Sequence, residues 1–169
     1  GVNASVGGTL ALGANKVTTG SSVMILASGA SLTRTSGWVY GSLQKSAATG
    51  APALTFEIGD ASVYAPVTTA FTGVSVAGTL TASTTAGDHP SIGSSMLSST
   101  TSVNRYWTLT SAGTTFGSCD VTFTFVSGDI DAGASTGNFL VGRYAGLWSA
   151  PSIGTRTSTS TQATGLTAF

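Results

Sequence analysis

Charged side chains are scarce in this sequence. Only 7% of its 169 residues are Asp, Glu, Lys or Arg, and six acidic and six basic residues cancel to a net charge of zero. Ordinary soluble domains contain about 25% charged residues. The basic residues are scattered and form no basic run, so the chain cannot neutralise many phosphates. Nucleic acids and anionic membrane surfaces are therefore not expected partners.

Cysteine and long apolar runs are also nearly absent. Cys119 is the only cysteine, so no disulfide can form within the chain. With no His nearby it lacks an activating base, and a small buried strand residue is expected. The longest apolar run, Val23–Ala27, is far shorter than the roughly 20 residues that a membrane-spanning helix needs. No transmembrane helix is predicted.

Small and hydroxylated residues dominate instead, with 29 Thr, 25 Ser and 23 Gly. Thr favours strands, whereas Gly and Ser favour turns, and the hydroxyls keep a surface hydrated without charge. An apolar content of 41% and a mean hydropathy of +0.32 provide enough apolar side chains to form a buried core, which argues against disorder. A surface without net charge promotes association, which suits a subunit built to assemble. Its exposed hydroxyls are candidate sites of O-glycosylation.

Apolar and polar residues alternate with a period of two along much of the chain, and no window shows a convincing 3.6-residue period. Roughly ten short strands separated by turn signals, one of them over residues 138–144, predict an all-β fold, an antiparallel β-sandwich of Ig-like or jelly-roll-like form. Antiparallel pairing is expected because no crossover helices are available. Residues 1–36 are predicted to form an N-terminal β arm with a meander or stacked β-repeat, and residues 37–169 the sandwich.

The first twelve residues read as one long strand with a single apolar face. An unpaired strand of this kind promotes aggregation unless another strand covers its edge. It is therefore a candidate donor strand that is added to a neighbouring subunit, with pairing inside its own chain as the alternative. The residues of the apolar face are Val2, Ala4, Val6, Leu10 and Leu12.

No group of titratable residues has the form of an active site. The only histidine, His89, lies in an Asp-His-Pro turn, and no serine is singled out as its nucleophile. Glu57 is the only glutamate, and the five aspartates lie mostly at turns, which disfavours the paired carboxylates of sugar hydrolysis. The chain is not expected to be an enzyme.

Asp129 and Asp131 leave a Gly-bounded turn on the same side and are candidate oxygen ligands for Ca²⁺. The full calcium loop with its terminal Glu is absent. The alternative is that these aspartates cap backbone N–H groups of the turn.

The aromatic residues allow two interpretations. Trp38, Tyr64 and Trp148 are candidates for stacking on a sugar ring, as in carbohydrate-binding modules, while aromatic residues on alternating strands more often belong to the core. Arg105 and Trp107 should share one face of their strand, where Arg105 is expected to pair or stack in a structural role.

Five segments resemble a β-sandwich module that recurs in large secreted and cell-surface proteins of Bacteroidetes and related bacteria. They are GWVYGSLQK, FEIGDASVYAPV, TTAGDHP, SVNRYWTLT and VTFTFVSGDIDAGA, within a similarity that covers about residues 37–169. The resemblance implies a β-sandwich located outside the cell or on its surface, and it brings no catalytic residues. The start at Gly1, without a leader, fits a processed secreted product.

Together these features lead to one leading hypothesis. The chain is expected to be a structural subunit of an extracellular filament or surface assembly, a homopolymer joined by its N-terminal donor strand. The alternative is a carbohydrate-binding or adhesive module of a secreted protein.

Overall fold

The structure, a computed structural model, describes all of residues 1–169 and consists of strands, loops and three very short 3-10 helices. The all-β class predicted from the sequence is confirmed. None of these helices approaches the length and apolarity needed to cross a membrane. They span Ile92–Ser94, Ser127–Asp129 and Thr136–Asn138.

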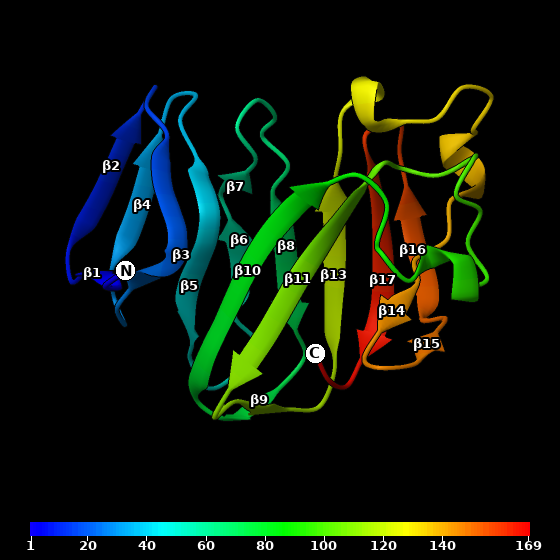
Figure 1. The fold of residues 1–169 in the computed structure, drawn as a ribbon. Coiled ribbons are helices and arrows are strands. Elements are labelled where there is room, and N and C mark those ends of the chain that lie inside the picture. The colour runs from blue at the N-terminus through cyan, green and yellow to red at the C-terminus, as the bar shows by residue number, and fades with distance from the viewer.

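Two large sheets make up most of the fold (Figure 1). The six-stranded sheet contains, in spatial order, β1 (Ala4–Val6), β3 (Val17–Leu26), β5 (Val39–Ala47), β10 (Gly78–Ala86) and β11 (Arg105–Ala112), with β7 (Ile58–Gly59) also paired to β5. The five-stranded sheet contains β16 (Ser152–Arg156), β17 (Ser160–Leu166), β13 (Cys119–Thr124), β8 (Val67–Phe71) and β6 (Ala53–Phe56).

Three two-stranded sheets complete the fold. They pair β2 (Thr9–Gly13) with β4 (Ser31–Arg34), β9 (Val74–Val76) with β12 (Thr115–Phe116), and β14 (Arg143–Tyr144) with β15 (Trp148–Ser149). The strand predicted over residues 138–144 is mostly absent, since only its last two residues form β14.

The N-terminal part of the chain coils into stacked, parallel turns of roughly 20 residues, the length of a short solenoid repeat. Ala4 lies opposite Met24, and Met24 lies opposite Leu43, one turn further along the chain. Glycines with positive φ form corners, with Gly13 at 55° and Gly29 at 81°. This arrangement is the stacked β-repeat that the sequence left open beside a meander.

The prediction of a purely antiparallel sandwich is wrong for this part, because β1, β3, β5 and β7 pair in parallel. Parallel strands need a crossover, and the sequence contains no helix to supply it. Here β2 and β4 provide the return path, since each carries the chain back before the next long strand begins. The later strand pairs, such as β10 with β11 and β8 with β13, are antiparallel as predicted.

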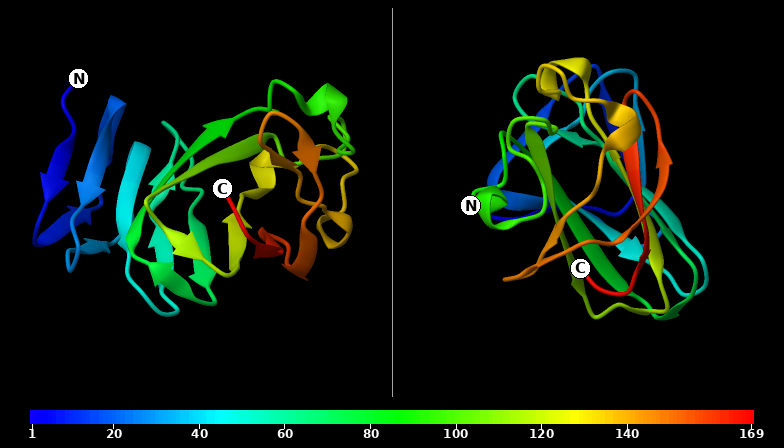
Figure 2. Two further views of the ribbon diagram at one scale, coloured as in Figure 1. Left: turned by 90° about the horizontal axis from the view of Figure 1, so that it is seen from below. Right: turned by 90° about the vertical axis from the view of Figure 1, so that its right-hand side faces the viewer.

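The remaining strands form a sandwich-like arrangement, in which β10 and β11 lie across from the five-stranded sheet (Figure 2). Period-two alternation explains which side chains point between the layers. In β8, Val67, Thr69 and Phe71 are buried, and in β10, Leu80 and Ala82 are buried while their neighbours are more exposed.

One apolar core cluster extends from the coil into the sandwich. It includes Leu12 and Met24 of the coil as well as Val121 of β13, so buried packing continues across Gly37, where the sequence predicts the end of the arm. Each fully buried large apolar side chain of this cluster contributes about 1.5–3 kcal/mol. The division into residues 1–36 and 37–169 stays a prediction about domains.

Candidate binding cavity

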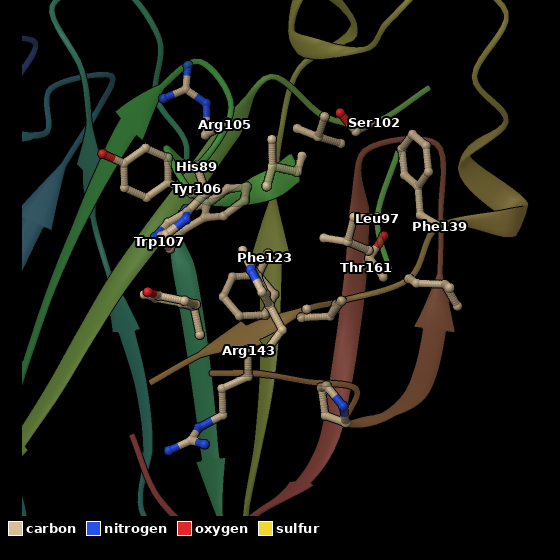
Figure 3. Close-up of a pocket in the computed structure, with 18 of the residues that line it drawn as sticks. His89, Leu97, Ser102, Arg105, Tyr106, Trp107, Phe123, Phe139, Arg143 and Thr161 are labelled. Carbon is tan, nitrogen blue, oxygen red and sulfur yellow. The ribbon is translucent and has the colours of Figure 1, made fainter. Parts of the chain in front are cut away.

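A cavity of about 590 Å³ lies between β11 of the six-stranded sheet and β13 and β17 of the five-stranded sheet (Figure 3). Residues 88–103 and 138–151 contribute the rest of its wall. The cavity volume falls in the range of small-molecule sites, about 300–1,000 Å³. It is therefore the principal candidate for a functional site.

Apolar side chains from three strand segments form the inner wall. Trp107 and Leu109 alternate along β11 toward the cavity, and Val121 and Phe123 do so along β13. The rings of Trp107 and Phe123 lie 5.2 Å apart and are tilted by 49°. The indole N–H of Trp107 donates to the carbonyl oxygen of Ala65 at 3.0 Å, which fixes the ring in place. The wall is thus apolar and oriented by packing.

Thr161 of β17 is the unusual member of this wall. Only 4% of its surface is exposed, and its Oγ1 forms no hydrogen bond with any protein group. It lies opposite Phe123 in the β13–β17 ladder and lines the cavity. A buried hydroxyl without a partner costs about 1–3 kcal/mol, a cost that a hydrogen bond to a group in the cavity would remove.

An aromatic cluster borders the cavity at one end. His89 lies 5.2 Å from Tyr106, 4.8 Å from Tyr144 and 5.1 Å from Trp148, measured between ring centroids. The Trp148 indole donates to the carbonyl oxygen of Ser91 at 2.9 Å, and the Ser91 amide donates to His89 Nδ1 at 3.1 Å. His89 is therefore an aromatic and hydrogen-bonding member of a turn.

Above the cavity, a polar network ties β11 to neighbouring turns. Arg105 is buried and forms ion pairs with Asp129 at 2.8 Å and with Asp60 at 2.7 Å. Its Nη1 also lies 3.4 Å from the Thr84 hydroxyl. This bears out the expectation of a structural role for Arg105. Burial alone would lower the pKa of Arg105, but the two carboxylates outweigh burial and raise that pKa.

The two candidate calcium ligands accept hydrogen bonds from different partners. Both carboxylate oxygens of Asp129 accept hydrogen bonds from Arg105. The oxygens of Asp131 accept from the Ser102 amide at 2.9 Å and from the Asn104 side chain at 2.7 Å. These bonds hold the pKa of Asp131 below its ordinary value. The geometry favours the structural alternative, because protein donors already engage all four oxygens.

The three predicted stacking residues do not form one platform. Trp38 and Tyr64 lie together, with ring centroids 6.1 Å apart, whereas Trp148 belongs to the aromatic cluster around His89. The guanidinium of Arg34 lies 3.8 Å from the centroid of the Tyr64 ring and covers that face. Of the three, only Trp148 lines the cavity.

The predicted donor strand is two strands rather than one, because Gly7 and Gly8 separate β1 from β2. Val6 pairs with Leu26, and Leu10 pairs with Leu32, both in parallel and within the same chain. Leu12 is 3% exposed in the core, while Val2 is 91% exposed. β1 and β2 each pair with one strand only, β3 and β4, so both keep a free backbone edge, and β1 with its exposed neighbour Val2 forms the edge of the six-stranded sheet.

The sequence did not predict several of the residues that line the cavity, because no motif or spacing marks them as a group. Leu97 lies in the Ser-rich connection, and Phe139, Leu140 and Val141 were assigned to a strand. Thr161 is one of 29 threonines. Three consecutive apolar residues, Phe139–Val141, lie between Gly137 and Gly142, and this was the one feature of the sequence that indicated an apolar segment without regular structure.

Comparison with protein-family models, with curated proteins and with solved structures finds no match for this chain. The resemblance to a secreted module of Bacteroidetes therefore rests on the five sequence segments alone.

Proposed function

We propose that this chain is a structural subunit of an extracellular or cell-surface assembly, and that copies of it join through the two open edges of the six-stranded sheet. The observation that carries the proposal is the position of β1 and β11 at opposite edges of that one sheet. A β1 edge that pairs with the β11 edge of the next copy would continue the sheet from chain to chain. Such a contact is heterologous and leads to an open filament.

Both edges present unpaired backbone groups. β1 pairs only with β3, and β11 pairs only with β10. Outside these ladders, no backbone hydrogen bond involves residues 106–112. Edge strands with free N–H and C=O groups are templates for pairing with another chain.

Neither edge carries an exposed charged side chain or a proline, two of the features that normally block such pairing. Natural edge strands are protected by Lys, Pro or inward charges. Residues 1–9 and 106–112 contain no charged side chain and no proline. The single charge of β11, Arg105, is buried in ion pairs at the start of the strand. The charge-poor surface of the whole chain also opposes association only weakly.

This proposal revises the donor-strand hypothesis in one respect. Val2, Ala4 and Val6 would contribute the edge that meets the neighbour, whereas Leu10 and Leu12 stay in the coil of their own chain. Pulling Leu12 out of its core would cost more than the few contacts that a neighbour offers.

Lysine substitutions at the two edges test the proposal. Ser5→Lys places a charge on β1 and Thr110→Lys places one on β11, both at exposed positions. Sedimentation velocity and electron microscopy should show filaments of the native chain and only monomers of either variant. An equimolar mixture of the two variants should form dimers, since each keeps one intact edge. Ser62→Lys, in an exposed loop, is the matched control and should still polymerise.

Two outcomes would contradict the proposal. Native protein that stays monomeric at high concentration would exclude assembly through either edge. Filaments that persist in both lysine variants would mean that other surfaces join the subunits.

The alternative of a glycan-binding module has weaker support. Arg34 covers one face of the Tyr64 ring, and Trp148 is packed edge-on against His89. Polysaccharide binding that disappears on Trp148→Ala, in a chain that does not polymerise, would favour this alternative.

A further inference from the structure

We infer that the cavity between β11, β13 and β17 binds a small, mostly apolar, ring-containing molecule, and that the Thr161 hydroxyl forms its one internal hydrogen bond. The binding site uses side chains of β11, whereas the proposed assembly uses the free backbone edge of that strand. The inference rests on the juxtaposition of a large apolar cavity with a buried hydroxyl that has no protein partner.

The size of the cavity exceeds what imperfect core packing leaves behind. Protein interiors are packed as densely as organic crystals, and most voids are no larger than a water molecule. Here the cavity bounded by the two sheets and by residues 88–103 and 138–151 measures about 590 Å³. The same sheets pack tightly a short distance away, where Phe56, Leu43 and Leu80 are almost fully buried. The separation of the sheets is therefore local to the cavity.

The lining favours flat apolar rings over sugars. Aromatic faces and edges from β11, β13 and the cluster around His89 suit a flat ring, which packs well in offset or edge-to-face contacts. A sugar would bury several hydroxyls against the apolar inner wall formed by β11 and β13, and each unpaired hydroxyl would be costly. The site therefore fits a molecule with few polar atoms.

The charges of the wall argue against an ionised group in the interior. Asp88, Arg105 and Arg143 are the charged residues that line the cavity; only Arg105 is buried, and both Asp60 and Asp129 neutralise it. Thr161 remains as the one unengaged polar atom there. A hydroxyl can donate or accept, so a single oxygen on the ligand, in a phenol or a ketone, matches it.

Access to the cavity lies beside its irregular wall. Met96, Leu140 and Tyr144 line the cavity and are also among the exposed large apolar side chains of the molecule. They belong to residues 88–103 and 138–148, which are mostly loop. A ligand would enter between these two segments and reach Thr161 on β17.

A matched pair of probes tests the assignment, 2-naphthol and naphthalene, which differ by one hydroxyl. Ligand-detected NMR and calorimetry on the whole chain should show that 2-naphthol binds about two- to tenfold more tightly, the range that one hydrogen bond provides. Thr161→Val removes the hydroxyl with little change in shape and should abolish this preference while both probes still bind.

Thr69→Val is the matched control, because Thr69 is a fully buried threonine of β8 whose side chain does not line the cavity. It should keep the preference of the native chain. Leu97→Trp fills the cavity from the loop side and should weaken the binding of both probes at least tenfold. The inference is overturned if neither probe binds the native chain, if both bind it equally, or if Thr161→Val keeps the preference. It is also overturned if Leu97→Trp leaves the affinities unchanged.

Discussion

Arg105 donates two hydrogen bonds to the Asp129 carboxylate, from Nε at 2.8 Å and from Nη2 at 3.1 Å. The side chains of both residues are almost fully buried. The same guanidinium reaches Asp60 at 2.7 Å. One side chain at the start of β11 therefore joins the turn after β7 and the short helix at residues 127–129. Arg105 also lines the candidate cavity, so this network holds that part of the cavity wall in place.

Asp129→Ala should destabilise the fold by about 3 kcal/mol, because it leaves a buried guanidinium with only one carboxylate. Chemical denaturation followed by intrinsic fluorescence measures the loss. Asp131→Ala is the matched control. It removes a carboxylate two residues away that has no ion-pair partner and should cost much less. Equal losses in the two variants would contradict the importance of the Arg105 pair.

Acid should weaken the fold through Asp60. Burial raises the pKa of Asp60, but hydrogen bonds from the Ser62 amide, from Arg105 and from the Val63 amide outweigh it and leave that pKa below the ordinary value of 3.8. A carboxyl group with a lowered folded-state pKa stabilises the fold above its unfolded-state pKa. That contribution is lost as the pH falls from about 3.8 through the lower folded-state pKa.

Asp60→Asn tests this pH dependence. The variant should be less stable than the native chain at pH 7, and the difference in the free energy of unfolding should shrink as the pH falls below 4. Denaturation curves at a series of pH values provide the measurement. A difference that stays constant down to pH 2 would show that Asp60 contributes no ionised interaction.

The coil residues should differ sharply in their importance for stability. Leu12→Ala removes buried methyl groups from the core and should cost about 2–5 kcal/mol. Val2→Ala, at the most exposed large apolar residue of the chain, should change the stability by less than about 0.5 kcal/mol. Thermal unfolding of the two variants under conditions that keep them monomeric distinguishes these effects. A neutral Leu12→Ala would mean that the first turn of the coil does not pack as the structure describes.

Cys119 should not react while the protein is folded. Its thiol is fully buried in β13, and burial raises its pKa to about 12, so the reactive thiolate is scarce at neutral pH. A thiol-specific reagent such as an aromatic disulfide should label the native chain only at the rate of unfolding, and the chain in denaturant at once. Rapid labelling under native conditions would show that β13 opens locally.

Much of the fold follows from particular residues in the sequence. Period-two alternation predicted strands rather than helices, and β8 and β10 bury every second side chain, because a strand turns successive side chains to opposite sides. The burial of Cys119 and the structural role of Arg105 were also predicted. The parallel pairing of β1, β3 and β5 was not, since alternation indicates a face of a strand but not the direction of its partner.

The candidate site could not be predicted, because its parts are far apart in the chain. Thr161 resembles every other strand threonine until β17 places it opposite Phe123 and beside an apolar wall from residues 138–141. Trp38 and Tyr64 were grouped with Trp148 by residue type, and their distance from the aromatic cluster became visible only in three dimensions.

By itself the sequence determined that this protein is nearly all strand and turn, carries almost no charge and has one buried thiol, since local alternation and composition decide these properties. Only the tertiary structure decided which edges stay open, which hydroxyl is buried without a partner, and where the two sheets separate. The reason is physical: edges, cavities and unpaired atoms are defined by what lies next to a residue in space, and those neighbours come from other turns of the chain.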